Sequence, residues 1–395
     1  MTTSSTNRKP GRQRVPGPAA AAASIGRPEV ARACLTLALA LGALLLSACR
    51  DSDASVRIAA AGNWREFHGA MNKRGIDLAV EELNAAGGVR GRPMQLVALD
   101  DSSDGTRAVT VASEFFNDAT ILGVVGHIES GPMVAAAKIY DQGLPAIATT
   151  ATSPDLSGMS PWVFRVISSD SVNGRDIAAY ARRLGLRRAA IIYENNSYGR
   201  GLADAFERHF GGEIIGSDPI ASDSTADFEP HVSWLKARRP DVVFVAGTAS
   251  PGIALLREAR RQALTATFIG GDGWSGVAAS PAAEGVVVAT PFSSLDPRPE
   301  VRRFVQAFRA RYQMEPDANA ALAYDATRLL AEAIEKGGPT RLAIRDWLTR
   351  RASESAYQGV TGPIQFTAGG DIVGKPFVMT RIRAGALMVD PNGGA

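Results

Sequence analysis

The chain of 395 residues has little of what catalytic metal sites and covalent frameworks require, with only two cysteines and four histidines. Two cysteines exclude a disulfide-dense scaffold and any zinc or iron–sulfur site that needs several thiolate ligands. The histidines show no H-x-x-x-H spacing, which argues against a histidine-rich catalytic metal site. The sequence therefore implies neither a metal nor a cofactor.

Motifs of common enzyme classes are also absent. The sequence contains no G-x-x-x-x-G-K-[ST], no G-x-S-x-G and no H-E-x-x-H. Residues 271–276 match G-x-G-x-x-G, but a dinucleotide site needs a crossover helix there, and Pro281 and another strand-like run follow too soon. A hydrolase remains an alternative on counts alone, because His68 and His127 fall at expected strand ends and Ser130 follows closely. We expect a protein that is not an enzyme.

The charge is small and unevenly placed. The net value is +3, from 43 Lys and Arg against 40 Asp and Glu. Residues 1–33 contain six basic residues and one acid, and residues 33–48 are uncharged with a Leu/Ala-rich centre. This order is typical of a secretory signal, and the apolar run is short for a membrane span of about 20 residues. Without residues 1–48 the chain has 37 basic and 39 acidic residues, so nucleic acid is not an expected partner.

The apolar run ends in L-S-A-C, with the cysteine at position 49, and these four residues resemble a bacterial lipobox. In a lipobox the cysteine receives a lipid and the signal is cleaved just before it. The alternative is an uncleaved anchor helix with a chance cysteine. We expect residues 1–48 to be a lipoprotein signal peptide, Cys49 to be lipidated and residues 49–55 to be a polar tether. The protein would then be exported and held on the periplasmic or cell-surface side of a membrane by its lipid.

From Val56 the chain alternates β-rich runs with amphipathic helical patterns. Strand-like runs at 56–61, 94–99, 121–125 and 145–148 are separated by helical patterns at 71–86, 106–117 and 131–142. The alternation then restarts, with helical patterns at 171–184, 198–210, 227–238 and 252–262 and strand-like runs at 188–193, 213–219, 241–246 and 286–290. Three more helical patterns reach residue 350, and two late strands are expected near 363–367 and 376–382. Such alternation predicts parallel sheets with crossover helices.

Because the alternation of strands and helices occurs twice along the chain, it predicts an α/β protein of two Rossmann-like lobes with a ligand cleft between them. The expected division is residues 56–169 for the first part of lobe 1, 170–291 for lobe 2, 292–374 for the return to lobe 1, and 375–395 for a C-terminal segment partly in lobe 2.

Four motifs occur in a fixed order along the chain. They are V-E-E-L-N-A-A-G-G-V-R-G-R-P at 80–93, G-V-V-G-H at 123–127, P-D-L at 154–156 and Y-G-R-G-L at 198–202. Together they resemble the branched-chain (Leu/Ile/Val) amino-acid-binding proteins of ABC transporters, over essentially the whole chain from Val56. The resemblance implies the type I periplasmic-binding fold, with two lobes joined by a hinge. It also implies a solute-binding protein that closes on a small ligand and delivers it to an ABC permease.

The resemblance implies a set of binding residues as well. It places the α-carboxylate of the ligand on Ser130 and Thr152, with Thr150 or the Ala151 backbone nearby, and the ammonium group on Asp272 of the second lobe. Hydroxyl groups at a helix start suit an anion, and a carboxylate in a closing cleft needs a cation as partner. The alternatives are an N-cap role for Ser130 and a turn role for Asp272.

Three more residues complete this set. Tyr198 matches an aromatic residue that closes over the ligand, while His68 and Thr248 stand where the family often has aromatic side chains. His68, Thr248 and the neighbouring Glu129 replace apolar lining by polar groups, so amino-acid binding is expected and the preference for a branched side chain is open. Trp274 is expected to pack inside its lobe. Binding of amides, urea or aromatic acids is an alternative, as is a role as the sensory partner of a signalling receptor.

Overall fold

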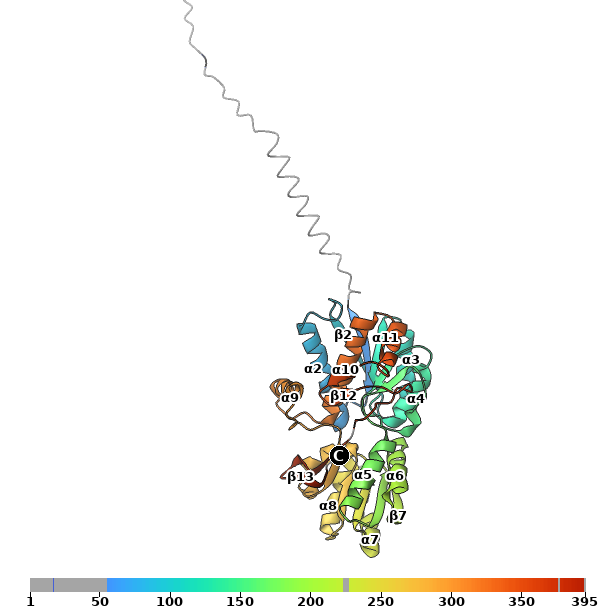
Figure 1. Cartoon of the computed structure of the whole chain (residues 1–395), viewed down its shortest axis with the longest axis vertical. Coiled ribbons are helices and arrows are strands. Elements are labelled where there is room, and N and C mark those ends of the chain that lie inside the picture. Colours follow the sequence, from blue (N-terminus) through green and yellow to red (C-terminus); the bar gives the residue numbers. More distant parts are fainter. Residues whose placement is uncertain (1–16, 18–54, 223–226, 376, 394–395) are drawn as a thin grey trace, which may run out of the picture. The chain divides into compact units, whose positions relative to one another are not determined.

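The computed structural model describes residue 17 and residues 55–222, 227–375 and 377–393. Residues 55–395 form one compact unit, which contains two β-sheets covered by helices (Figure 1). The expected signal peptide and Cys49 lie outside the described residues. Within the described residues, no helix is long and apolar enough to cross a membrane.

The first sheet has five parallel strands in the order β2-β1-β3-β4-β5. The strands are β1 (Val56–Gly62), β2 (Met94–Asp100), β3 (Ile121–Gly126), β4 (Ala146–Ala148) and β5 (Val163–Arg165). All residues of β1 except Arg57 are buried, because helices cover both faces of the sheet. Its crossover helices are α2 (Phe67–Ala85), α3 (Gly105–Asn117) and α4 (Ser130–Tyr140). We call this sheet and its helices lobe 1.

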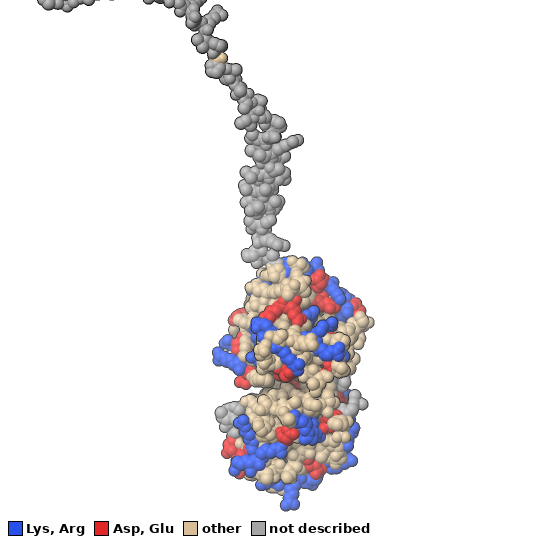
Figure 2. All heavy atoms as spheres, turned by 90° about the vertical axis from the view of Figure 1, so that its left-hand side faces the viewer, with Lys and Arg blue, Asp and Glu red and all other residues tan. Residues whose placement is uncertain are grey.

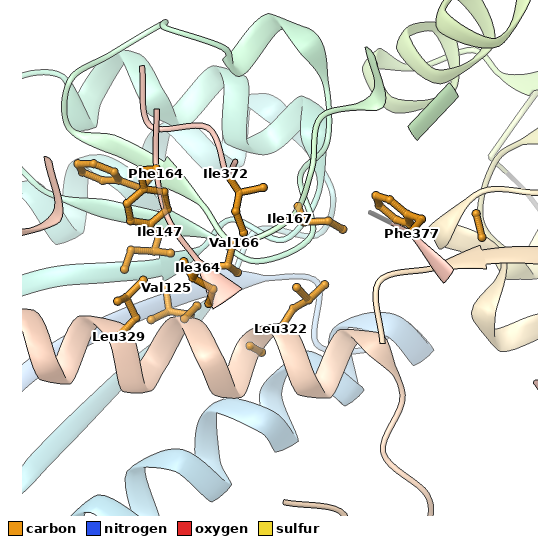
Figure 3. Close-up of a cluster of buried hydrophobic side chains, with 14 of the residues drawn as sticks. Val125, Ile147, Phe164, Val166, Ile167, Leu322, Leu329, Ile364, Ile372 and Phe377 are labelled. Atoms are coloured by element: carbon orange, nitrogen blue, oxygen red, sulfur yellow. The ribbon is translucent and has the colours of Figure 1, made fainter. Parts of the chain in front are cut away.

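Three helices from the C-terminal part of the chain return to lobe 1. They are α9 (Pro299–Tyr312), α10 (Ala318–Gly337) and α11 (Arg341–Arg350). Figure 3 shows Leu322 and Leu329 of α10 facing Val125 of β3 and Ile147 of β4, all within one buried cluster. α10 therefore supplies much of the apolar cover for one face of the first sheet, although it lies about 200 residues after β3 in the sequence.

The second sheet has seven strands in the order β14-β13-β10-β9-β8-β6-β7. Its parallel part consists of β6 (Arg188–Glu194), β7 (Glu213–Ile220), β8 (Val242–Ala246), β9 (Thr267–Gly270) and β10 (Val287–Thr290). The late strands β13 (Val378–Arg383) and β14 (Ala386–Val389) add an antiparallel edge next to β10. The helices of this lobe, lobe 2, are α5 (Asp170–Arg183), α6 (Ser197–Phe210), α7 (Glu229–Arg238) and α8 (Ala249–Arg261).

The predicted α/β fold is confirmed, and the differences are local. The expected helix at 71–86 begins earlier, at Phe67, and three short strands were not expected: β5, β14 and β11 (Tyr357–Gly359), which pairs with β12 (Gly362–Ile364). The G-x-G-x-x-G match forms an eight-residue 3-10 helix, η2 (Asp272–Ala279), after β9. A 3-10 helix of this length is no crossover helix, so the local structure differs from that of a dinucleotide site.

The chain passes between the two lobes three times. The passages lie between β5 and α5, between β10 and α9, and between β12 and β13. Side chains tie two of them together: Ser168 Oγ donates to the carbonyl of Lys375 at 2.6 Å, and Lys375 Nζ donates to the carbonyl of Val166 at 2.9 Å. Phe377 belongs to a buried cluster that contains residues of both sheets (Figure 3). Three adjacent passages of this kind form a hinge.

Candidate ligand-binding cleft

A cavity of about 590 Å³ is lined by residues of both lobes, and the surface is hollowed where the lobes meet (Figure 2). The lining follows the carboxyl ends of the parallel strands, which is where ligands bind in open α/β sheets. Lobe 1 contributes residues that follow its first four strands, β1 to β4; examples are Asn63, Ser103, Ser130 and Thr150. Lobe 2 contributes residues at or after the ends of β6, β7, β8 and β9; examples are Glu194, Ser222, Thr248 and Asp272.

Ser130 begins α4 and lines the cavity while being 3% exposed. Its Oγ accepts hydrogen bonds from the backbone N–H groups of Thr152 at 3.2 Å and Ser153 at 3.1 Å. The hydroxyl thus ties the loop after β4 to the start of α4. Gly131 also lines the cavity, and no atom lies within 4 Å of the position that a Cβ would take there. The first turn of α4 is therefore open to the cavity, and a helix N-terminus favours an anion.

The three consecutive residues predicted after β4 lie at different depths. Thr150 lines the cavity, and its Oγ1 donates to the carbonyl of Ile128 at 2.6 Å. Ala151 and Thr152 are fully buried and are not among the lining residues. Thr152 Oγ1 has no hydrogen bond of standard geometry, although it lies close enough to Asp170 to lower the pKa of that carboxyl group. A direct ligand contact for Ala151 or Thr152 stays a prediction.

On the opposite wall, Asp272 lies at the start of η2 and lines the cavity. Its Oδ1 accepts hydrogen bonds from the Tyr198 hydroxyl and from Asn173 Nδ2, both at 3.1 Å. Burial raises the pKa of Asp272 to about 6. Tyr198 also accepts from the Gly273 N–H at 3.1 Å, so the aromatic ring and the carboxylate are held as one unit. Trp274, two residues after Asp272, is fully buried in the core of lobe 2, as expected.

A second carboxylate lies close to Asp272, and sequence analysis did not single it out. Asp170 begins α5, is fully buried, and has no well-formed hydrogen bond to either carboxylate oxygen. Burial and the nearby charge of Asp272 raise the pKa of Asp170 well above its usual value, against a smaller opposing effect of Thr152 and Arg165. Because the two acids lie close together, ionisation of one disfavours ionisation of the other.

Glu194, at the end of β6, is a further lining residue that the sequence did not indicate. The side chain is 1% exposed, yet it carries no ion pair among the described residues. Its oxygens accept from Thr248 Oγ1 at 2.6 Å, Ser222 Oγ at 2.7 Å and Asn196 Nδ2 at 2.9 Å. The predicted residue Thr248 therefore lines the cavity with its hydroxyl turned toward this carboxylate.

His68 lies in the first turn of α2, on the wall of lobe 1. Its Nε2 is 2.9 Å from Glu129 Oε1, which also accepts from Ser103 Oγ at 2.6 Å. Burial alone would lower the pKa of His68, but Glu129 together with the charges of Glu66 and Asp317 outweighs burial and raises it. The same contact with His68, together with Ser103, lowers the pKa of Glu129 against the effect of burial. Both shifts favour the ionic form of the pair.

The hydrolase alternative loses support from this geometry. His127 is fully buried behind the lining, with Nδ1 at 2.6 Å from Asp101 Oδ2 and Nε2 at 2.9 Å from the Tyr140 hydroxyl. Ser130 Oγ accepts from two backbone N–H groups and not from a histidine. In the described part of the chain, no group of three or more His, Cys, Asp and Glu side chains is arranged to hold a metal ion.

Residues 62–386 match the periplasmic binding protein family. The chain belongs to this family. It is 30% identical over 368 residues to the Leu/Ile/Val-binding protein homolog 2 of Brucella abortus. This alignment covers 89% of this chain and 95% of the relative. It is 29% identical over 357 residues to the Leu/Ile/Val-binding protein of Escherichia coli strain K12, covering 88% and 95%.

A solved structure shows the same architecture for this periplasmic binding protein. An ABC transporter substrate-binding protein from Desulfitobacterium hafniense in complex with Leu is similar with a TM-score of 0.75 and 33% identity, covering 85% of this chain and 100% of the other. The chain is therefore an extracytoplasmic substrate-binding protein of the ABC transporter type, a class without catalytic activity. Such proteins bind a small ligand and deliver it to a permease.

Proposed function

We propose that this protein captures a free amino acid and delivers it to an ABC permease. The observation that carries the proposal is the pairing of opposite electrostatic features across the cleft. Lobe 1 presents the Ser130 hydroxyl and the open N-terminus of α4, while the other wall presents Asp272, held by Tyr198. The first feature suits a carboxylate and the second suits an ammonium group, so together they describe a zwitterion.

Capture proceeds by closure of the hinge. The ligand touches both walls, so its binding energy favours the arrangement in which both walls are within reach. Asp272 gives a specific reason for closure, because an ammonium group beside it offsets the cost of its desolvated charge. The Leu complex of the Desulfitobacterium hafniense protein and the names of the Leu/Ile/Val-binding relatives support an amino acid as the ligand class.

The test is a binding screen of the chain without residues 1–49 against the twenty amino acids, acetamide, urea and benzoate. Thermal shift identifies the ligand, because binding to the native state raises the unfolding temperature. Calorimetry then compares the wild type with Asp272→Ala, which we expect to lose well over tenfold in affinity. Binding of only an amide, urea or an aromatic acid would contradict the proposal, as would an unchanged affinity in Asp272→Ala.

A matched control shows that any loss is specific to the cleft. Asp218 is a half-buried lobe 2 carboxylate outside the lining, paired with His231 at 2.6 Å. Asp218→Ala is expected to keep the wild-type affinity. An equal loss in both variants would indicate general damage to lobe 2 and would remove the argument for Asp272.

We also propose that Cys49 carries the lipid that holds the protein at the membrane. The L-S-A-C run at the end of the apolar stretch supports this reading, and an extracytoplasmic location of the family fits it. In cell fractionation, the full chain is expected with the membranes and Cys49→Ser in the soluble fraction. A Cys49→Ser protein that stays with the membranes would contradict the lipid anchor without affecting the ligand proposal.

A further inference from the structure

An aromatic ring of lobe 1 lies against lobe 2 at the rim of the cleft. Phe67, the first residue of α2, lines the cavity and is 52% exposed. Two atoms of its ring, Cδ1 and Cε1, lie 3.4 and 3.5 Å from the position that a Cβ on Gly276 would take. Gly276 lies in η2 of lobe 2 and also lines the cavity. The ring therefore forms a contact between the lobes, and it belongs to none of the buried apolar clusters formed by the described residues.

Gly276 and Ala249 form a slot for this ring on lobe 2. A Cβ at Gly276 would stand 3.0 Å from the Cβ of Ala249 and would also face the ring of Phe67, so a larger side chain has no room between them. Gly276 is not among the glycines with a positive φ, so its backbone does not itself call for glycine. The missing side chain at this position thus makes room for the ring from the other lobe.

Both partners of the contact are fixed within their own lobes. A Cβ at Gly69 would stand 1.7 Å from the carbonyl oxygen of Asn63, so the loop before α2 is folded closely onto the first turn of that helix. On lobe 2, Trp274 and Val277 are fully buried in the core and anchor η2 on either side of Gly276. The ring and its slot therefore approach or separate mainly as the two lobes move.

The slot lies on the same short helix as the proposed ammonium contact. Asp272 and Gly276 are both residues of η2, and Asp272 is held to lobe 2 by the Tyr198 hydroxyl. A movement that brings Asp272 toward a ligand held at Ser130 therefore brings Gly276 toward Phe67. Contact of the ring with the slot removes apolar surface from water, which favours the closed arrangement of the lobes.

From this geometry we propose that Phe67 is a latch, a positioning residue that enters the Gly276 slot and sets how long the lobes stay closed over the ligand. The proposal rests on the proposed function, since it assumes that the cleft closes on a small ligand, but it does not depend on the ligand's side chain. A contact that exists only in the closed state affects release of the ligand more than its capture. Loss of a ring that is about half buried corresponds to dissociation that is about fivefold faster.

Stopped-flow kinetics of the chain without residues 1–49 test the latch, with L-leucine and L-alanine as probes. Phe67→Ala should release both amino acids about fivefold faster and change their association rates less than about twofold. Phe67→Leu, which keeps a large apolar side chain, should restore most of the wild-type rate. Unchanged dissociation in Phe67→Ala would overturn the latch and leave the proposed function standing. A loss confined to leucine would also overturn it, because the ring would then act on the side chain of the ligand.

A failure of the proposed function is distinguishable from a failure of the latch. If the wild type binds no amino acid but binds acetamide, urea or benzoate, the proposed function is overturned, and the same variants test the latch with that compound. A wild type that binds none of these compounds would overturn both.

A double-mutant cycle separates the latch from damage to lobe 2. Gly276→Val fills the slot and should speed dissociation in the wild type, but much less in Phe67→Ala, where the displaced ring is already gone. Any strain of the valine against Ala249 is present in both backgrounds and cancels in the cycle. Leu342→Ala is the matched control, because Leu342 is 53% exposed on α11 and lies outside the lining; its rates should equal those of the wild type. Additive effects of Phe67→Ala and Gly276→Val would overturn the latch.

Discussion

Asp272→Asn should stabilise the ligand-free protein at neutral pH while removing its ability to bind. The amide has the same shape, and its oxygen can still accept from Tyr198 and Asn173, so the geometry of the wall is kept. Burial raises the pKa of Asp272 from 3.8 to about 6. A group whose pKa is raised by folding holds its proton more tightly in the native state than in the unfolded state. The favourable contribution of this proton to the stability of the fold is present below pH 3.8 and is lost as the pH rises through about 6.

The size of this effect follows from the shift. One pKa unit corresponds to about 1.4 kcal/mol, so a shift of roughly two units gives at most about 3 kcal/mol, and partial exposure of the side chain reduces this to about 1–3 kcal/mol. For a chain of this length, that equals roughly 1–4 °C in unfolding temperature. The gain in stability of Asp272→Asn comes from the removal of a desolvated negative charge that destabilises the fold but is needed for ligand binding.

Differential scanning calorimetry without ligand, at about pH 4.5 and about pH 8, measures the effect directly. Wild type and Asp272→Asn should unfold at similar temperatures at the acid pH, and the variant at a higher temperature at the alkaline pH. Addition of the ligand should then raise the unfolding temperature of the wild type only. If the difference between the two proteins does not grow with pH, Asp272 is not a destabilising carboxylate and the electrostatic argument for the ammonium site fails.

Three further outcomes are expected. Amino-acid affinity should fall as the pH is lowered through about 6, because protonated Asp272 no longer pairs with an ammonium group; a calorimetric affinity that is flat between pH 5 and 8 would contradict this. Gly174→Val should destabilise the protein by about 1–3 kcal/mol in urea unfolding, because a Cβ there would stand 2.6 Å from the Cβ of Ala205 in the contact between α5 and α6. Phe206→Ala should cost about 3–5 kcal/mol in the same assay, since its fully buried ring stacks on Phe244 at 4.1 Å; a loss below about 1 kcal/mol would mean that this aromatic cluster is not tightly packed.

The alternation of strands and helices was readable from the sequence because most elements span several turns or five or more strand residues. Several of the shortest strands were not predicted, although β4 and β12, with three residues each, fell in expected strand-like runs. β5 (Val163–Arg165) and β11 (Tyr357–Gly359) have three residues each, too few for a periodic pattern, and β14 forms only because β13 offers an edge. These strands depend on a neighbouring strand, which the local sequence does not encode.

The residues of the candidate site that follow the ends of strands could be predicted from the sequence. Of the residues predicted to hold the ligand, those that line the cavity are His68, Ser130, Thr150, Tyr198, Thr248 and Asp272. Their contacts with a ligand remain predictions. Asp170 was missed because an acidic residue in the first turn of a helix is common, and only the crossing of the chain between lobes brings it next to Asp272. Glu194 was missed because its significance depends on donors from three separate loops.

The way the chain returns on itself has a consequence for how the protein comes to be folded. Lobe 1 lacks the cover of its sheet until α10 (Ala318–Gly337) is available, and lobe 2 lacks its antiparallel edge until β13 and β14 are available. Neither lobe is complete before almost the whole chain is present, so many stabilising contacts join residues far apart in the sequence, an arrangement that slows folding.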